Sequence, residues 1–337
     1  MEALFMKKVL LFIYLTVFLT SFQVIGRNPS LRFHQNGEFK ILQLTDLHLH
    51  DSVEEIVLAT VKEMVESEKP DLVVLTGDIT FKYRDSTFTH IKNLARIFSD
   101  EQCPWAVVLG NHDEECGYTR SYISKVYRSL PYNRNAVTQG IRGVTNFVIP
   151  IAGKKSNHDA VLYFFDSNAY NSEKNKKLGK FDWIDFTQLD WYRKTSAAMT
   201  KKNDGKPIPS IAFFHIPLLE YEMVWADSTS TSIGVKNDKA STPLYNTGLF
   251  ASMLQCGDIM GTFVGHDHIN NYIGCYNGIA LAYGQYTGPI NYGVLKPGAR
   301  VIVLKEGKRE FTTWIREKGG KIKYMCHYPN SFLQDAE

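Results

Sequence analysis

The chain has 337 residues, of which 44% are hydrophobic and 22% charged, a composition typical of a folded globular protein and not of a disordered one. A chain of this length can bury a sizeable core without disulfide bonds. The net charge of +3 is too small to indicate a protein that binds nucleic acid or a membrane surface.

A short apolar run follows two lysines at the N-terminus. Lys7 and Lys8 precede the run at 9–25, which polar residues interrupt. A basic start before a short apolar stretch predicts a signal peptide over residues 1–26, with Gly26 at the cut. A signal anchor is the competing interpretation, because the run approaches the length of a membrane span. Both predict the secretory pathway, with a secreted or lumenal protein that has no membrane contact beyond this leader.

The first half of the mature chain alternates apolar runs with amphipathic stretches. The pattern predicts strands and helices in the order β-α-β-α-β, at 39–45, 53–66, 71–76, 86–98 and 105–109. This order implies a parallel or mixed sheet with helices outside.

The second half is richer in short strands. We predict strands at 160–165, 211–214, 261–264, 278–283 and 300–304, and helices near 187–198 and 245–254. An α/β fold of two mixed sheets flanked by helices fits this pattern. The stretch 227–242 is rich in Ser and Thr and has no periodicity, which favours an exposed loop or a lid over a site. Residues 306–337 are expected to be a C-terminal strand and tail.

The five cysteines form no C-x-x-C pair, which argues against a zinc ribbon or a thioredoxin-type motif. Cys256 and Cys275 would suit a disulfide in a secreted protein, and buried free thiols are an equally supported alternative.

Five short polar motifs each follow a predicted strand. They are Asp46-Leu47-His48, Gly77-Asp78, Gly110-Asn111-His112-Asp113, His215 after an apolar strand, and Gly265-His266-Asp267-His268. In α/β folds, loops at the carboxyl ends of strands carry the sites. Asp78 lies 32 residues after Asp46 and Asn111 lies 33 after Asp78, each about one β-α unit. We therefore expect these side chains to lie close together.

The residue types in these motifs suit a pair of metal ions. Carboxylate and amide oxygens are hard donors, and imidazole binds Zn, Fe and Mn. Two neighbouring ions lower the pKa of a shared water and hold phosphoryl oxygens. A glycine stands before Asp78, Asn111 and His266, where it would permit a tight turn. Each motif alone is weak, and only their combination and order indicate a metal site.

The set D-x-H, G-D, G-N-H-D, strand-His and G-H-x-H resembles the calcineurin-like metallophosphoesterase superfamily, in particular its purple-acid-phosphatase-like branch. The resemblance covers residues 38–305. It implies a four-layer αββα sandwich and a phosphoric ester hydrolase that uses a hydroxide bridging two metal ions, which could be Fe, Mn or Zn.

The resemblance also implies a role for each site residue. One ion would be held by Asp46, His48, Asp78 and His268. The other would be held by Asp78, Asn111, His215 and His266, so that Asp78 bridges. Asn111 and His112 would contact the substrate, with His112 protonating the leaving alkoxide as the catalytic acid. Asp113 is expected to orient His112.

Two positions depart from true purple acid phosphatases. Their first motif is D-x-G, whereas here it ends in His48. Their second motif carries a tyrosine that ligates ferric iron, and the matching residue here is Phe81. We therefore expect His48 to replace the tyrosinate and the protein not to be purple.

These features predict a phosphomonoesterase acting on a small-molecule or phosphoprotein ester, with no nucleic-acid partner. A phosphodiesterase acting on nucleotide or lipid diesters is the alternative with the same site. A binding module that has lost its metals is the non-catalytic alternative, which the filled ligand positions disfavour.

Overall fold

The computed structural model describes residues 30–333 except 83, 155, 157, 172–176 and 290–292. The leader predicted at 1–26 and the last four residues lie outside the described residues. Leu31–Glu337 form one compact unit. No helix in the described part of the chain is long and apolar enough to cross a membrane.

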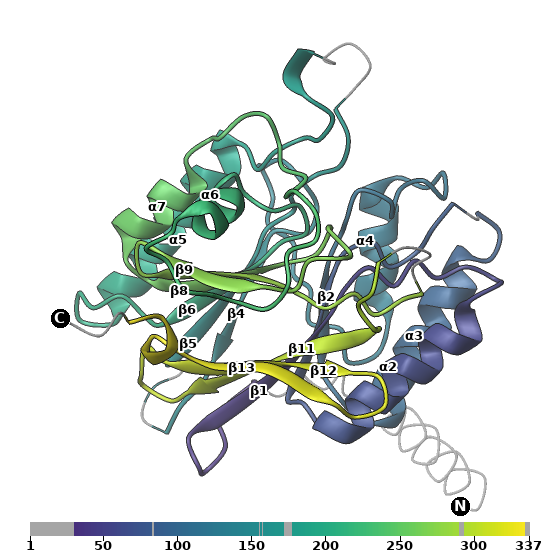
Figure 1. The fold of residues 1–337 in the computed structure, drawn as a ribbon, viewed down its shortest axis with the longest axis horizontal. Helices are drawn as coiled ribbons and strands as arrows, with labels where there is room; N and C mark the ends of the chain where they lie inside the picture. Colours follow the sequence, from purple (N-terminus) through teal and green to yellow (C-terminus); the bar gives the residue numbers. More distant parts are fainter. Residues whose placement is uncertain are drawn as a thin grey trace, which may run out of the picture. The chain divides into compact units, whose positions relative to one another are not determined.

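The first sheet has six strands in the order β13-β12-β11-β1-β2-β3 (Figure 1). The strands are β1 (Glu38–Leu44), β2 (Leu72–Thr76), β3 (Trp105–Val108), β11 (Gly298–Lys305), β12 (Phe311–Glu317) and β13 (Ile322–Tyr328). β1, β2 and β3 are parallel, whereas β11 pairs antiparallel with β1. The three parallel strands therefore end at the same edge of the sheet.

The second sheet has seven strands in the order β4-β5-β6-β8-β10-β9-β7. They are β4 (Phe147–Ile151), β5 (Ala160–Phe164), β6 (Ser210–Phe213), β7 (Ser232–Ile233), β8 (Ile259–Val264), β9 (Ile273–Tyr276) and β10 (Ile279–Tyr283). The four central strands are parallel, so β6 and β8 also end side by side.

Helices cover the outer face of each sheet. The first sheet carries α2 (Glu54–Glu68), α3 (Thr87–Asp100) and α4 (Arg120–Ser129), and the second carries α5 (Phe186–Lys202), α6 (Glu220–Ala226) and α7 (Leu249–Cys256). A short 3-10 helix, Asn330–Phe332, follows β13. Each set of helices packs on its sheet through its own apolar cluster, and a third cluster fills the space between the sheets. The predicted four-layer αββα sandwich is thus confirmed.

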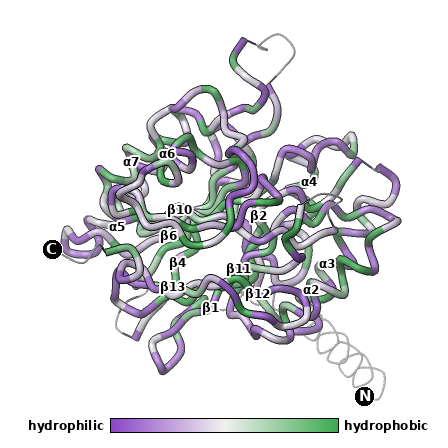
Figure 2. Tube along the Cα trace, viewed as in Figure 1, coloured by the Kyte–Doolittle hydropathy of each residue, from purple (hydrophilic) through white to green (hydrophobic). Residues whose placement is uncertain are grey.

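Helix α2 shows how the sequence produces one of these layers. Val57, Val61, Met64 and Val65 recur at helical spacing and are all buried against the sheet. Acidic residues occupy the first turn, where their charge interacts favourably with the positive end of the helix dipole. The helix ends at Lys69, whose backbone is left-handed. The tube in Figure 2 alternates between hydrophobic and hydrophilic colours along α2 and α3, as expected for helices with one buried face.

The sequence pattern missed several elements in the described chain. β4 contains Pro150, and its residues alternate between buried and partly buried, so it does not form a continuous apolar run. The helix predicted at 245–254 begins only at Leu249, because Gly248 has a φ of +88°. The stretch 227–242, predicted to be a loop, includes the short strand β7, and the Asn270 side chain accepts hydrogen bonds from the backbone at 237 and 238.

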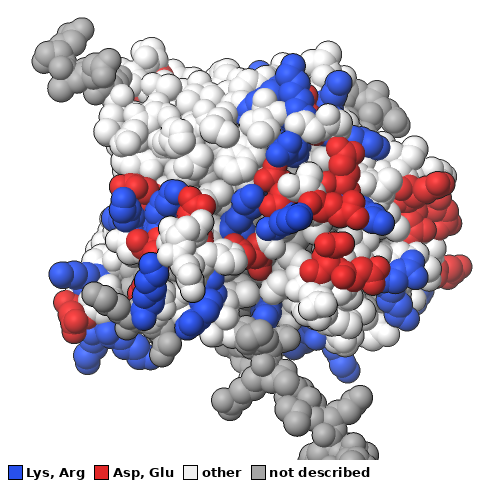
Figure 3. All heavy atoms as spheres, turned by 90° about the horizontal axis from the view of Figure 1, so that it is seen from below, with Lys and Arg blue, Asp and Glu red and all other residues white. Residues whose placement is uncertain are grey.

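All five cysteines are free thiols, so Cys256 and Cys275 are not joined. On the face drawn in Figure 3, basic and acidic side chains are interspersed and do not segregate into a single basic patch.

Candidate metal centre

The predicted ligands lie at the carboxyl ends of five strands. Asp46 and His48 follow β1, Asp78 follows β2 and Asn111 follows β3. The remaining ligands follow the neighbouring strands β6 and β8 of the second sheet, and are His215, His266 and His268. The site therefore lies where the parallel strand ends of the two sheets meet.

Two groups of donor atoms converge there. Asp46, His48 and His268 form one group, and Asp78, His215 and His266 form the other, with all donor atoms of a group within 4.8 Å of one another. This is the partition that the sequence resemblance implied. Within the first group, Nε2 of His48 and Nε2 of His268 are 3.1 Å apart. Within the second, Nε2 of His215 and Nδ1 of His266 are 3.2 Å apart.

Asp78 lies between the two groups. Its Oδ2 is 3.2 Å from Nε2 of His215 and 3.8 Å from Nε2 of His48. Its Oδ1 accepts the backbone N–H of His112, which fixes the rotation of the carboxylate. Asn111 joins the second group, with Oδ1 3.2 Å from Nε2 of His215. This arrangement suits a carboxylate that bridges two ions.

The protonation states of His48, His266 and Asp78 suit cation binding, whereas those of His215 and His268 do not. Burial opposes protonation of His215, but Asp78 outweighs it and raises the pKa to about 9, and Asp46 likewise raises the pKa of His268. Burial lowers the pKa of His48 to about 4, and burial together with the charge of His215 lowers the pKa of His266 to about 3. Burial opposes ionisation of Asp78, but His215 outweighs it and holds the pKa of that carboxylate well below its usual range. Neutral imidazoles and an ionised buried carboxylate are the forms that bind metals.

The donor set fits a pair of metal ions. Nε2 of His48 and Nε2 of His268 face each other at 3.1 Å, so both lone pairs can turn toward one cation when the two rings are neutral. A cation with nitrogen ligands at about 2.0–2.1 Å would satisfy such lone pairs. Nitrogen, carboxylate and amide donors together suit Zn, Fe or Mn.

Four ligand residues have a left-handed backbone. The φ angles are 52° for Asp46, 46° for His48, 52° for Asp78 and 80° for His266. A non-glycine residue in this region costs about 1–2 kcal/mol. Because strained backbone is typical of functional sites, its presence at four ligands indicates that these loop conformations serve the site and not stability alone.

The motif glycines are required mainly because the loops approach one another closely. A Cβ on Gly110 would lie 2.2 Å from Oδ1 of Asp78, and one on Gly265 would lie 2.2 Å from Oγ1 of Thr45. Of the three glycines that precede ligands, only Gly77 has a positive φ, at +92°. The predicted reason, a tight turn, therefore holds at one position, and close packing explains the other two.

Asp113 ties two ligand loops together. Its buried carboxylate accepts the backbone N–H groups of Asp78, Ile79, Thr80 and Gly110 at 2.7–3.1 Å. The expectation that Asp113 orients His112 was wrong, because both of its oxygens are engaged by the backbone.

Glu115 and Tyr170 place polar atoms beside the two nitrogens of the His112 ring. Oε1 of Glu115 is 2.8 Å from Nδ1, and the Tyr170 hydroxyl is 3.3 Å from Nε2. The same hydroxyl accepts a hydrogen bond of 2.7 Å from Nδ2 of Asn111. Sequence reasoning missed both residues. Glu115 stands three residues after His112, a spacing that allows contact in a turn, whereas nothing in the sequence indicates Tyr170.

Three aromatic rings, which we call the aromatic collar, surround the donor groups: Phe81, Tyr170 and Phe181. Phe81 packs edge-on against His48 and His112, with centroids 5.4 Å from each. Phe181 packs on His266 at 4.6 Å and stacks with Tyr170. Phe81 thus occupies the position of the family's tyrosine as a packing residue.

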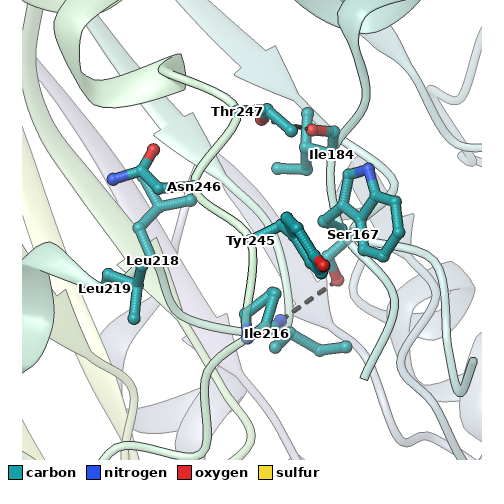
Figure 4. Close-up of a pocket in the computed structure, with 10 residues that line it drawn as sticks. Ser167, Ile184, Ile216, Leu218, Leu219, Tyr245, Asn246 and Thr247 are labelled. Atoms are coloured by element: carbon teal, nitrogen blue, oxygen red, sulfur yellow. Dashed lines mark hydrogen bonds between the residues drawn. The ribbon is translucent and has the colours of Figure 1, made fainter. Parts of the chain in front are cut away.

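Figure 4 shows a small apolar pocket whose walls include residues next in sequence to segments of the site. Its walls include Ile216, which follows His215 directly, and Trp183, which lies two residues after Phe181. The Ser167 hydroxyl accepts the N–H of Ile216 at 3.1 Å and holds this wall in place. The pocket is therefore continuous with the segments that carry the site.

A family model for calcineurin-like phosphoesterases matches residues 39–270, more than half of the chain. The chain belongs to the calcineurin-like phosphoesterase family. Among relatives, a probable inactive purple acid phosphatase 29 of Arabidopsis thaliana is 32% identical, over 86% of this chain and 82% of its own length. The phosphatase DCR2 of Saccharomyces cerevisiae is 29% identical, over 89% of this chain and 58% of its own length.

Solved structures share the fold of this calcineurin-like phosphoesterase. A dimetal phosphatase from Danio rerio superposes with a TM-score of 0.59, over 86% of this chain and 98% of that one, at 12% identity. The purple acid phosphatase PPD1 of yellow lupin superposes with a TM-score of 0.52, over 87% of this chain and 54% of that one, at 13% identity. At such identities the likeness establishes the fold alone.

Proposed function

We propose that this chain is a metal-dependent phosphomonoesterase. The observation that carries the proposal is the complete donor set: all seven predicted ligand residues lie in two convergent groups, with Asp78 between them. A protein that kept this fold only for binding would have no use for strained backbone at four ligands. The word "inactive" in the names of plant relatives describes those proteins, and the donor set here favours catalysis.

The donor groups define the place of the reaction. Asp46, His48, His268 and Asp78 would hold one ion, and Asp78, Asn111, His215 and His266 the other. When bound, the ions supply a nucleophilic water of lowered pKa and positive charge for the phosphoryl oxygens. The protein itself supplies orientation, through carboxylates and imidazoles that loop packing and backbone hydrogen bonds hold in place.

His112 lies outside both donor groups and is placed to donate a proton. Oε1 of Glu115 lies 2.8 Å from Nδ1 and orients the ring by accepting a hydrogen bond from that nitrogen. Nε2 then faces the site beside the Tyr170 hydroxyl. A proton delivered from this nitrogen to the leaving oxygen would assist departure of poor leaving groups.

We propose a monoester substrate rather than a diester because two relatives named as phosphatases match 86% and 89% of this chain. One bacterial relative, a probable cyclic nucleotide phosphodiesterase of Psychrobacter arcticus, is 27% identical over 57% of this chain. A phosphodiesterase therefore remains the second candidate, with the same site and a different choice of substrate.

The test is turnover of p-nitrophenyl phosphate and bis-p-nitrophenyl phosphate by the purified mature chain, with metals quantified on the same sample. We expect about two metal ions per chain and preferred hydrolysis of the monoester. Preference for the diester would replace the monoesterase with the phosphodiesterase. Protein that neither binds Mn, Zn or Fe nor turns over either ester would overturn both enzyme proposals in favour of a binding module.

We also propose that the chain enters the secretory pathway, on the basis of the leader at 1–26. Expression in a eukaryotic cell and N-terminal sequencing of the product test this. A mature N-terminus close to residue 27 supports a cleaved signal peptide, and an intact N-terminus in the membrane fraction supports the anchor.

A further inference from the structure

Two lysines lie on the aromatic collar that surrounds the metal centre. Nζ of Lys82 is 4.6 Å from the centroid of the Phe81 ring. Nζ of Lys180 is 4.8 Å from the centroid of Phe181 and 5.7 Å from that of Tyr170. At these distances a ring face attracts an ammonium group, so each lysine is held near the site and does not extend freely into solvent.

No carboxylate in the described part of the chain forms an ion pair with either ammonium. Among the ion pairs between described residues, none involves Lys82 or Lys180, although both side chains are exposed. The carboxylate of Glu115 faces Nδ1 of His112, on the opposite side of that ring from Nε2 and the Tyr170 hydroxyl. The two positive charges are therefore available to a ligand.

The lysines flank the place where the leaving group would lie. Their supporting rings, Phe81 and Tyr170, both contact the imidazole of His112, with centroids at 5.4 and 5.9 Å. In the proposed function, His112 protonates the leaving oxygen, so the alcohol part of the substrate would lie beside this ring. Lys82 would approach it from the side of Phe81, and Lys180 from the side of Tyr170 and Phe181.

We propose that Lys82 and Lys180 form an anion subsite for the alcohol part of the substrate. The preferred substrates are then phosphomonoesters whose alcohol carries a second anionic group, such as a carboxylate or another phosphate. This inference rests on the proposed function for the position of the leaving group. Positive charge on both sides of the leaving group would bind such an ester more tightly than a neutral analogue of the same size.

Kinetics with a matched pair of substrates tests the subsite. 3-Phosphoglycerate and glycerol 1-phosphate are both primary alkyl phosphates, and they differ in a carboxylate against a hydroxymethyl group. We expect kcat/KM to be higher for 3-phosphoglycerate, and the ratio to fall about twofold to fivefold in Lys82→Met and in Lys180→Met. The preference should also weaken as salt is raised, because exposed charges are screened.

Two control variants separate local from general effects of charge. Lys206→Met removes one positive charge from the turn before β6, at the edge of the sheet opposite the metal centre, and should leave the ratio unchanged. Lys180→Arg keeps the charge and should retain most of the preference. A serine-phosphorylated peptide with acidic flanks, compared with its neutral counterpart, shows whether the second anion belongs to a peptide or to a small molecule.

A binding measurement separates the subsite from the proposed function. Calorimetric titration of the metal-loaded chain with 3-phosphonopropionate and with propylphosphonate, which cannot be hydrolysed, reports affinity without turnover. Tighter binding of 3-phosphonopropionate that is lost in both lysine variants supports the subsite even if the chain hydrolyses nothing. An active chain whose substrate ratio and phosphonate affinities are the same in wild type, Lys82→Met and Lys180→Met would overturn the subsite and leave the phosphatase intact.

Discussion

At the scale of single residues, the structure distinguishes groups that hold the centre from groups that would act on the substrate. His112 belongs to the second kind, because Glu115 and Tyr170 occupy its two ring nitrogens while the donor groups lie beside it. Asp113, the next residue in the sequence, instead accepts hydrogen bonds from backbone N–H groups of two loops. Neighbouring residues in one motif thus have unrelated physical roles.

Replacing His112 by Ala should keep the metals and lower turnover by about a hundredfold for alkyl phosphates, because their leaving groups need a proton. p-Nitrophenyl phosphate, whose leaving group is stable as an anion, should lose much less. The measurement is kcat for both esters together with metal content. An equal loss for both esters would exclude a proton-donor role for His112.

Glu115 should act through His112 and not independently of it. Glu115→Ala should lower kcat about tenfold with little change in KM, because the ring loses the partner that fixes its tautomer and orientation. In a His112→Ala background the same change should have almost no further effect. Additive losses in this double-mutant cycle would show that the effect of Glu115 is structural, and Glu114→Gln is the neighbouring control.

At the scale of elements, the site depends on how closely the loops after β1, β2, β3, β6 and β8 pack. Gly110 in the loop after β3 touches Asp78 in the loop after β2, and Gly265 after β8 touches Thr45 after β1. Backbone N–H groups of two of these loops converge on Asp113. The ligand geometry is therefore a property of the loop cluster, not of any one motif.

Gly110→Ala should reduce metal binding strongly, because its Cβ would overlap the Asp78 carboxylate. We expect a loss of stability of about 2–4 kcal/mol in chemical denaturation, as for a steric clash in a packed interior. Gly205→Ala is the matched control: its φ is +76° but no atom lies within 4 Å of the added Cβ. It should cost about 1 kcal/mol and leave the metal content unchanged, and similar metal loss in both variants would contradict the packing argument.

At the scale of the whole molecule, the donor groups connect the two sheets. Asp46, His48 and Asp78 come from the first sheet, and His215, His266 and His268 from the second. A pair of ions would therefore link the two inner layers of the sandwich. The parallel strand ends make this possible, because both sheets present their carboxyl edges at one place.

Metal removal should accordingly destabilise the entire unit. Because a ligand that binds only the folded state stabilises it, chelation should lower the Tm and added Zn or Mn should restore it. Asp78→Ala should abolish this metal-dependent shift, since both donor groups lose the shared carboxylate. Differential scanning calorimetry with and without chelator is the measurement, and a Tm shift of unchanged size in Asp78→Ala would contradict a bridging role.

A buried ion pair behind the loop after β3 should contribute pH-dependent stability. Arg120 donates to Asp166 and to the carbonyl of Gly110. Burial opposes ionisation of Asp166, but Arg120 and backbone N–H groups outweigh it and lower the pKa of that carboxylate. A lowered pKa means that the contribution is present above the unfolded pKa of about 3.9 and is lost as the pH falls below it.

Asp166→Asn should therefore destabilise the fold by about 3 kcal/mol near pH 7, as expected when one partner of a buried pair is removed. The difference from wild type should shrink as the pH falls below about 4. Urea unfolding of both proteins at pH 7 and pH 3.5 measures it. A difference that is the same at both pH values would show that ionisation of Asp166 is not its source.

The fold class was predictable from the sequence, and the seven residues that the resemblance implied as ligands lie close together at the strand ends. An apolar run followed by a polar motif specifies a strand and the residue at its end, and parallel strands bring such ends together. The edge strand β4 was not predictable, since its alternating burial depends on β5, the neighbour with which it pairs. The helix was predicted to start at residue 245, too early, because the sequence does not show that Gly248 has a left-handed backbone, after which α7 begins.

By itself, the sequence determined the metallophosphoesterase architecture and the chemistry of the donor set, since strand order and residue type suffice for both. Only the tertiary structure decided which residues support that chemistry. Tyr170 contacts Asn111, which lies 59 residues away in the sequence, and Lys180 contacts the Tyr170 ring from the same β5–α5 connection. Such contacts depend on the distance between atoms in space, which is fixed when both sheets and their loops pack together, and no local pattern in the sequence records it.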